Sequence, residues 1–117
     1  MKHISLSLYE KALIFARRNE YAIARKYFQE SISAYPNNVI IWISYAQMEK
    51  RYGSMPKCRA ILRNGIHLNP NSSRLHIALG LHEMQRGNKN LGLEILRRAV
   101  ELDPTNEAVL KWKNHIE

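Results

Sequence analysis

The sequence lacks the features that would cross-link the chain or anchor it in a membrane. Cys58 is the only cysteine among 117 residues, so no disulfide can form within the chain. No apolar run approaches the roughly 18 residues of a membrane-spanning helix. Near the start, Tyr9, Glu10 and Lys11 interrupt the apolar residues too early for a secretory signal peptide. We therefore expect the cytoplasm, or another reducing soluble compartment such as an organelle stroma.

Clusters of catalytic or metal-binding residues are also missing. Cys58 falls in a column of small residues near the start of a predicted helix, which favours a packing role over a nucleophilic one. The five glycines recur at helix ends and helix contacts and form no phosphate-binding loop. We predict no enzyme activity, no metal and no cofactor. The histidines show no pairing typical of a metal site and are His3, His67, His76, His82 and His115.

Acidic residues are scarce relative to basic ones. Ten Asp and Glu oppose eighteen Lys and Arg, which gives a formal net charge of +8. Such a balance favours polyanionic or acidic partners if the cations line one surface. If they are spread evenly, they serve only solubility.

What the sequence does contain is a period of 34 residues. Pro36, Pro70 and Pro104 stand 34 apart, and polar residues that can cap a helix follow each of them. At the same interval lie Asn19, Gly53 and Gly87, residue types that tolerate the left-handed conformation at a helix end. Each unit of 34 residues is therefore predicted to contain two helices.

Small and large residues also recur at this interval, as expected for helices that pack closely against their neighbours. Each pair of helices can bury its apolar face only against the next pair, so the pattern predicts an all-α superhelix, a short solenoid of three helical hairpins and a capping helix. The small columns are Ala12, Ala46 and Gly80; Ala24, Cys58 and Gly92; and Ser31, Gly65 and Ala99.

We expect one domain over residues 1–117. Its repeats should cover about 5–38, 39–72 and 73–106, and a capping helix 107–117 should cover the last apolar face. Ser54 is expected to cap the fourth helix. The predicted helices span about 4–18, 20–34, 39–52, 55–68, 73–86, 89–102 and 106–116.

The repeat resembles the tetratricopeptide repeat (TPR) over essentially the whole chain. The second unit is similar to the half-a-TPR (HAT) variant, whose pattern of Trp, Tyr, Glu, Gly, Ala-Arg and Pro is matched by Trp42, Tyr45, Glu49, Gly53, Cys58-Arg59 and Pro70. The third unit keeps Glu83, Gly87 and Pro104 but has His76 in place of the Trp, while the first has Phe15 in place of the Glu. The resemblance implies a hybrid of the two repeat types.

Glu49 and Glu83 occupy equivalent places in successive units, where an amphipathic helix would otherwise carry an apolar residue. In HAT-like units this glutamate is structural, and we expect it to pair with Arg25 or Arg59 on a neighbouring helix. An unpaired buried carboxylate would be unfavourable. An acid–base pair for catalysis is the weaker interpretation, because repetition is what an architectural role predicts.

In TPR-like arrays the first helix of each hairpin lines a concave surface, and the resemblance implies a partner-binding groove there with a basic rim. Chaperone-binding TPR domains grip a carboxylate at places that hold Tyr9, Leu13, Ser44, Arg74 and Ala78 here. Only Arg74 keeps the charge, so recognition of chaperone tails is not expected. The predicted groove residues are Tyr9, Leu13, Arg17, Ile40, Ile43, Gln47, Lys50, Arg51, Arg74, Ile77, Leu81, Gln85 and Lys111.

Two functions are compatible with these features. The primary hypothesis is a non-enzymatic scaffold or assembly factor that holds a peptide or helix of a protein partner, with acidic segments preferred. The alternative is an RNA-binding or RNA-processing protein, as many HAT-like proteins are, in which the basic face contacts phosphates. Self-association through the exposed first helix is also conceivable.

Overall fold

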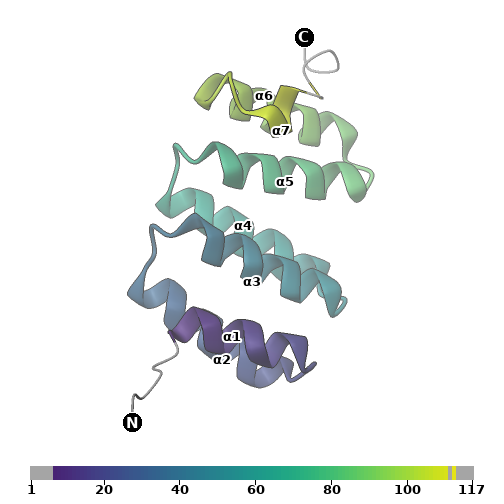
Figure 1. The fold of residues 1–117 in the computed structure, drawn as a ribbon. Coiled ribbons are helices and arrows are strands. Elements are labelled where there is room, and N and C mark those ends of the chain that lie inside the picture. The colour runs from purple at the N-terminus through teal and green to yellow at the C-terminus, as the bar shows by residue number, and fades with distance from the viewer. Residues whose placement is uncertain (1–6, 111, 113–117) are drawn as a thin grey trace.

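The computed structural model describes residues 7–110 and residue 112, and over this part of the chain it contains seven α-helices and no strand (Figure 1). Residues on one stripe of each helix from α1 to α6 are apolar, and these stripes face the neighbouring helices. The helices are α1 (Leu8–Arg17), α2 (Tyr21–Ala34), α3 (Val39–Arg51), α4 (Met55–Leu68), α5 (Ser73–Gln85), α6 (Lys89–Leu102) and α7 (Glu107–Leu110).

The predicted boundaries are confirmed to within a few residues, and α4 and α6 match them at both ends. The main difference is the start of α1, which was expected at residue 4. Ser7 has an extended backbone and its hydroxyl accepts a hydrogen bond from the Glu10 amide, so it caps the helix and α1 begins at Leu8. The predicted final helix 106–116 is described only as α7, because residues 111 and 113–117 lie outside the described residues.

The connections confirm the special roles of the repeated loop residues. Asn19, Gly53 and Gly87 have φ angles of 61°, 88° and 87°, in the left-handed region. Ser54 does immediately precede α4, but its side chain makes no capping hydrogen bond. Ser72 does cap α5, since its hydroxyl accepts from the Leu75 amide at 3.3 Å.

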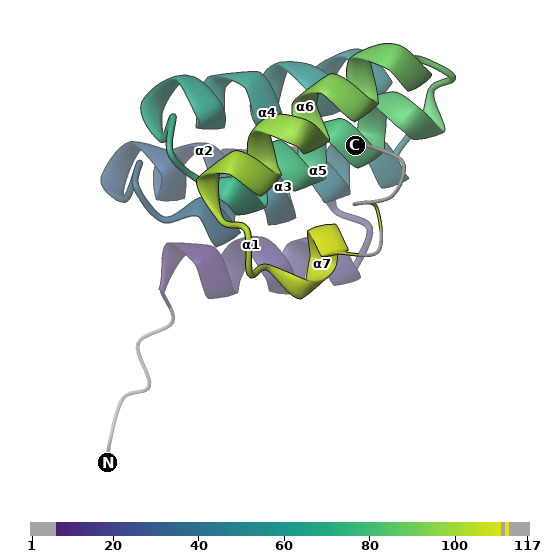
Figure 2. The ribbon, with the colours of Figure 1, turned by 90° about the horizontal axis from the view of Figure 1, so that it is seen from above.

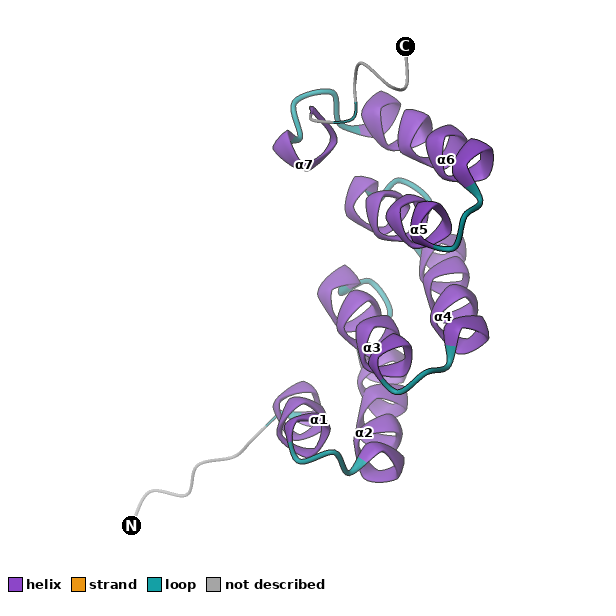
Figure 3. Ribbon diagram, turned by 90° about the vertical axis from the view of Figure 1, so that its right-hand side faces the viewer, coloured by secondary structure: helices purple, strands orange, loops and turns teal. Residues whose placement is uncertain are grey.

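The helices stack as hairpins into an elongated, curved array, with principal extents of 57 × 28 × 22 Å. Viewed from the side, α1, α3 and α5 line one side of the curve and α2, α4 and α6 the other (Figure 3). Viewed from above, α2, α4 and α6 again lie together, while α1 and α7 lie on the opposite side (Figure 2). We call the surface of α1, α3 and α5 the inner face and that of α2, α4 and α6 the outer face.

The repeated small residues are all buried, as their predicted packing role requires. Gly65 of α4 lies against the Trp42 ring of α3, where a Cβ atom would come within 3.1 Å of the indole. The indole nitrogen of Trp42 donates a hydrogen bond to the Pro36 carbonyl at 2.9 Å, which ties α3 to the preceding loop. His76, in the equivalent place one repeat later, is buried and its Nδ1 lies 2.7 Å from the Ser72 carbonyl.

A close backbone approach joins α5 and α6 and leads to a first prediction. A Cβ on Gly92 would lie 2.3 Å from the Met84 Cγ and 2.8 Å from the Gly80 carbonyl oxygen. The Met84 side chain can move, but the carbonyl can retreat only if the helices separate. Gly92→Ala should therefore destabilise the fold by about 2 kcal/mol, overriding the roughly 1 kcal/mol helix preference of alanine.

Thermal denaturation checks this prediction, with Asn90→Ala as the control because Asn90 is exposed on the same helix. Asn90→Ala should leave the melting temperature nearly unchanged. A Gly92→Ala variant as stable as the parent would show that the two helices are not in tight contact.

Candidate functional site

The inner face contains two recesses that repeat at the interval of the sequence. The first recess, about 140 Å³, lies between α1 and α3 above α2, and the second, about 180 Å³, lies between α3 and α5 above α4. Such repeated hollows follow from stacking one hairpin on the next. Leu13, Ala16, Phe28, Ser44, Gln47, Met48 and Arg51 of the first recess correspond, 34 positions on, to Gln47, Lys50, Leu62, Ala78, Leu81, His82 and Gln85 of the second.

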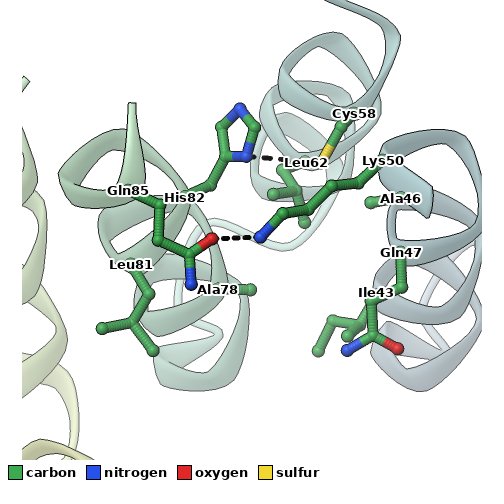
Figure 4. A pocket seen from close by; sticks show the side chains of 10 residues that line it. All are labelled: Ile43, Ala46, Gln47, Lys50, Cys58, Leu62, Ala78, Leu81, His82 and Gln85. Carbon is green, nitrogen blue, oxygen red and sulfur yellow. Dashed lines mark hydrogen bonds between the residues drawn. The ribbon is translucent and has the colours of Figure 1, made fainter. Parts of the chain in front are cut away.

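The second recess has an apolar interior and a polar mouth (Figure 4). Ala46 and Ala78 form opposite walls, and Leu62 of α4 lies at the base. At the mouth, the Lys50 ammonium group donates a hydrogen bond to the Gln85 side-chain oxygen and so connects α3 to α5. Small wall residues are what leave this volume open.

The first recess differs in its charge. Arg17 and Arg51 stand at its edge, both exposed and both in the last turn of their helices. That position lets each arginine interact favourably with the helix dipole. Within the described part of the chain, neither guanidinium group has an ion-pair partner. Two neighbouring cations are thus left available on the inner face.

The acidic residues of the inner helices do not offset these cations. Glu49 and Glu83 are almost completely buried and turn toward the outer helices. Both nitrogens of the Arg25 fork lie 2.9 Å from the Glu49 carboxylate, and Arg59 binds Glu83 in the same bidentate way at 2.6 and 3.0 Å. The predicted pairing is confirmed, so the repeated glutamates are structural.

Glu83 keeps its charge despite its burial. Burial by itself raises the pKa of its carboxyl. The hydrogen bonds from Arg59 and Asn88 and the nearby positive charge together lower this pKa by a larger amount, so the net shift is downward. A carboxyl whose pKa is lowered in the folded state stabilises the fold at pH values above the ordinary pKa of that group, which is about 4.3 for glutamate. That contribution is lost as the pH falls through the lowered value.

The resulting prediction concerns acid stability. The free energy of unfolding of the parent protein should fall more steeply below about pH 4.5 than that of a Glu83→Gln variant, which has no carboxyl to protonate there. Urea denaturation at a series of pH values checks this, with Glu94→Gln as the exposed control. Equal pH dependence of the parent and the Glu83→Gln variant would contradict it.

Cys58 and His82 form a contact that sequence reasoning missed. The Cys58 sulfur lies 3.6 Å from the His82 Nδ1 at the second recess, and both side chains are buried. Burial raises the pKa of the Cys58 thiol, and burial lowers the pKa of His82, so the two groups are neutral near pH 7. A thiolate–imidazolium pair would need the opposite shifts. The sequence signal that could have predicted this contact is the separation of 24 residues, which is the same as in the pairs Arg25–Glu49 and Arg59–Glu83.

Other predicted groove residues have varied surroundings. Ile40 and Arg74 are exposed at the starts of α3 and α5 and line neither recess. The Tyr9 hydroxyl lies 2.7 Å from the Ser44 hydroxyl, and this contact links α1 to α3. Ile77 is only 8% exposed because it packs in a cluster with Leu96, Ala99 and Trp112. Lys111 lies outside the described residues. The recesses contain the rest of the predicted set, namely Leu13, Arg17, Ile43, Gln47, Lys50, Arg51, Leu81 and Gln85.

Two further properties bear on the chemistry of the molecule. Over residues 7–110 and 112, no three or more His, Cys, Asp or Glu side chains are grouped so that they could hold a metal ion. In the same part of the chain, no helix combines the length and the apolar character needed to cross a membrane.

Comparison with known proteins identifies the repeat. Residues 6–38 match the family described as the tetratricopeptide repeat. A TPR-containing protein of Dictyostelium discoideum is 34% identical over 79 residues, which is 68% of this chain but only 6% of the relative's length. The chain therefore contains a tetratricopeptide repeat at residues 6–38 and is similar in sequence to a TPR-containing protein. Its assignment to the half-a-TPR subtype stays a prediction.

Solved structures share the architecture. The second TPR domain of the human RPAP3 protein, determined in complex with the HSP70 peptide SGPTIEEVD, has a TM-score of 0.72 at 16% identity and covers 94% of this chain and 92% of its own. YrrB, a TPR protein with an unusual peptide-binding site, has a TM-score of 0.72 at 15% identity over 92% of this chain and 55% of its own. These similarities establish the α-solenoid fold.

Proposed function

We propose that this chain is a non-enzymatic scaffold that binds a peptide or a helix of a protein partner on its inner face. The observation that carries the proposal is the pair of equivalent recesses, which together form an interrupted apolar surface edged by positive charge. Two structural neighbours are peptide-binding TPR proteins by their own descriptions, which supports the same use of the inner face here.

The charge of the inner face favours an acidic segment. Arg17, Lys50 and Arg51 edge the recesses. The acidic residues of α1, α3 and α5 within the described chain are Glu10, at the far end of α1 from Arg17, and the two buried glutamates paired with arginines. A partner with carboxylates on its surface would be attracted by these cations and oriented on the face.

Affinity capture from native extract tests the proposed function. The immobilised full chain should retain a stoichiometric protein partner whether or not the extract has been treated with nuclease. Arg51→Glu should release that partner, whereas Arg63→Glu, an exposed change on the outer α4, should not. Circular dichroism of both variants controls for unfolding. A partner that is retained equally by both variants would contradict the proposal.

RNA binding is the second candidate function, favoured by the same uncompensated cations. Proteins that bind single strands usually add aromatic side chains on which bases stack. The inner helices carry four aromatic residues, Tyr9, Phe15, Trp42 and Tyr45, and none of them is exposed. Tyr9, the candidate expected from the sequence, is half-buried against Phe28 and its hydroxyl contacts Ser44. These observations favour a protein ligand.

A titration of single-stranded RNA at increasing salt separates the two functions. Phosphate contacts by several cations would give a steep fall of log K with log salt, and Arg17→Ala with Arg51→Ala would flatten that slope. We expect no specific RNA binding. A steep slope that depends on Arg17 and Arg51 would replace the protein-binding proposal with the RNA-binding one.

A further inference from the structure

We propose that the segment bound on the inner face places one apolar side chain in the second recess and one or more carboxylates against Arg17 and Arg51 at the first recess. This inference rests on the proposed peptide-binding function and adds a ligand class and a register to it. It follows from the different chemistry of two hollows that occupy equivalent positions in the repeat.

The second recess has the size and lining for a single apolar group. Its volume is about 180 Å³, and an apolar cavity of roughly 150 Å³ accommodates a benzene-sized molecule. Ala46 and Ala78 form the walls, and Leu62 the base, so an entering aliphatic or aromatic side chain would meet mainly carbon atoms. Lys50 and Gln85 form the polar mouth of the recess, so the backbone of a bound segment would lie near their hydrogen-bonding groups (Figure 4).

The first recess has the chemistry for an anion. In the second recess the place of Arg51 is taken by the neutral Gln85, which already accepts a hydrogen bond from Lys50. Arg17 and Arg51 have no such partner in the described chain, and a guanidinium group can hold a carboxylate through two hydrogen bonds. These two arginines lie outside the positions by which chaperone-binding TPR domains hold a carboxylate, which are Tyr9, Leu13, Ser44, Arg74 and Ala78 here.

The repeat sets the spacing of the two groups. The two recesses are one repeat apart, and we take the step between them to be about the spacing of packed helices, on the order of 10 Å. An extended chain advances about 3.3 Å per residue. The apolar side chain and the carboxylates should therefore be separated by about three residues in an extended segment.

Selection from a random peptide library displayed on phage, with the folded full chain as the target, tests this inference. We expect the selected peptides to combine one bulky apolar residue with Asp or Glu at a fixed offset of about three. The same selection on two variants then assigns each preference to its recess. Arg17→Ala with Arg51→Ala should reduce the enrichment of Asp and Glu at least about tenfold, and Ala78→Leu, which fills the second recess, should abolish the apolar preference.

Matched variants control for charge and folding. Arg63→Ala with Lys89→Ala removes the same charge near the junction of α4 and α6, and Ala22→Leu adds the same side chain at an exposed position of α2. Both should select peptides like those of the parent, and circular dichroism should show all four variants folded. If Ala78→Leu fails to fold, Ala78→Val replaces it.

The outcomes distinguish the inference from the function on which it rests. Peptides that lack acidic residues, or whose acidic preference survives loss of Arg17 and Arg51, would overturn the proposed register while leaving peptide binding intact. Failure to select any peptide would overturn the proposed function, and the inference with it.

Discussion

Replacing Arg59 with alanine should lower the free energy of unfolding by about 3 kcal/mol, which corresponds to a fall of roughly 10 °C in the melting temperature. The variant leaves the Glu83 carboxylate, which has 0% exposure, with Asn88 as its remaining side-chain hydrogen-bond donor. An uncompensated buried charge is strongly destabilising. We expect the lower end of the usual range because about a third of the Arg59 side chain is exposed, so water can reach the vacated space.

Two comparison variants make this result specific. Arg98→Ala breaks the pair with Glu101, in which both side chains are more than half exposed, and should change stability by no more than about 0.5 kcal/mol. Replacing Arg59 and Glu83 together with methionine removes the buried charge and should restore most of the stability. Equal effects of Arg59→Ala and Arg98→Ala would show that the buried pair does not maintain the contact between hairpins.

Phe28→Ala should cause a loss of similar size, about 3–5 kcal/mol. Phe28 of α2 is 1% exposed, and its ring stacks on Tyr45 with centroids 5.3 Å apart and meets the edge of Tyr9 at 6.3 Å. It thereby joins α1, α2 and α3, so its removal would leave a cavity where three helices meet.

Chemical denaturation measures this loss against Tyr35→Ala. Tyr35 is an aromatic residue of similar size but is 62% exposed in the loop after α2, so its replacement should be nearly neutral. A Phe28→Ala variant as stable as Tyr35→Ala would mean that the first hairpin does not pack on α3 as described.

The sequence predicts most of the fold because the interval of 34 residues repeats both chemistry and geometry. Small residues such as Ala24 and Cys58 recur where backbones must approach, and Asn19 and Gly53 recur where a left-handed residue ends a helix. Arg25–Glu49 could be predicted because a carboxylate on an otherwise apolar stripe needs a cation. The sequence pattern predicts the start of α1 too early. Capping by Ser7 depends on the local backbone geometry, and the periodicity of the sequence contains no information about that geometry.

The candidate site was less predictable because it depends on what neighbouring repeats leave uncovered. Helix position alone predicts that Ile43 and Ile77, which stand one repeat apart, both line the groove. In the structure Ile43 lines the second recess, whereas Ile77 is covered as part of the cluster with Leu96, Ala99 and Trp112. The link from Lys50 to Gln85 and the contact of Cys58 with His82 likewise require the spacing between helices, which no single stripe reveals.

Mapping a bound peptide by NMR tests the central claim most directly. An isotope-labelled full chain would be titrated with a synthetic peptide that carries one leucine and, about three residues away, a pair of glutamates. We predict amide shift changes concentrated on α3 and on the facing sides of α1 and α5, with the largest near Arg51 and Ala78. Shift changes concentrated on α2, α4 and α6, or saturable binding that leaves the inner face unchanged, would contradict it.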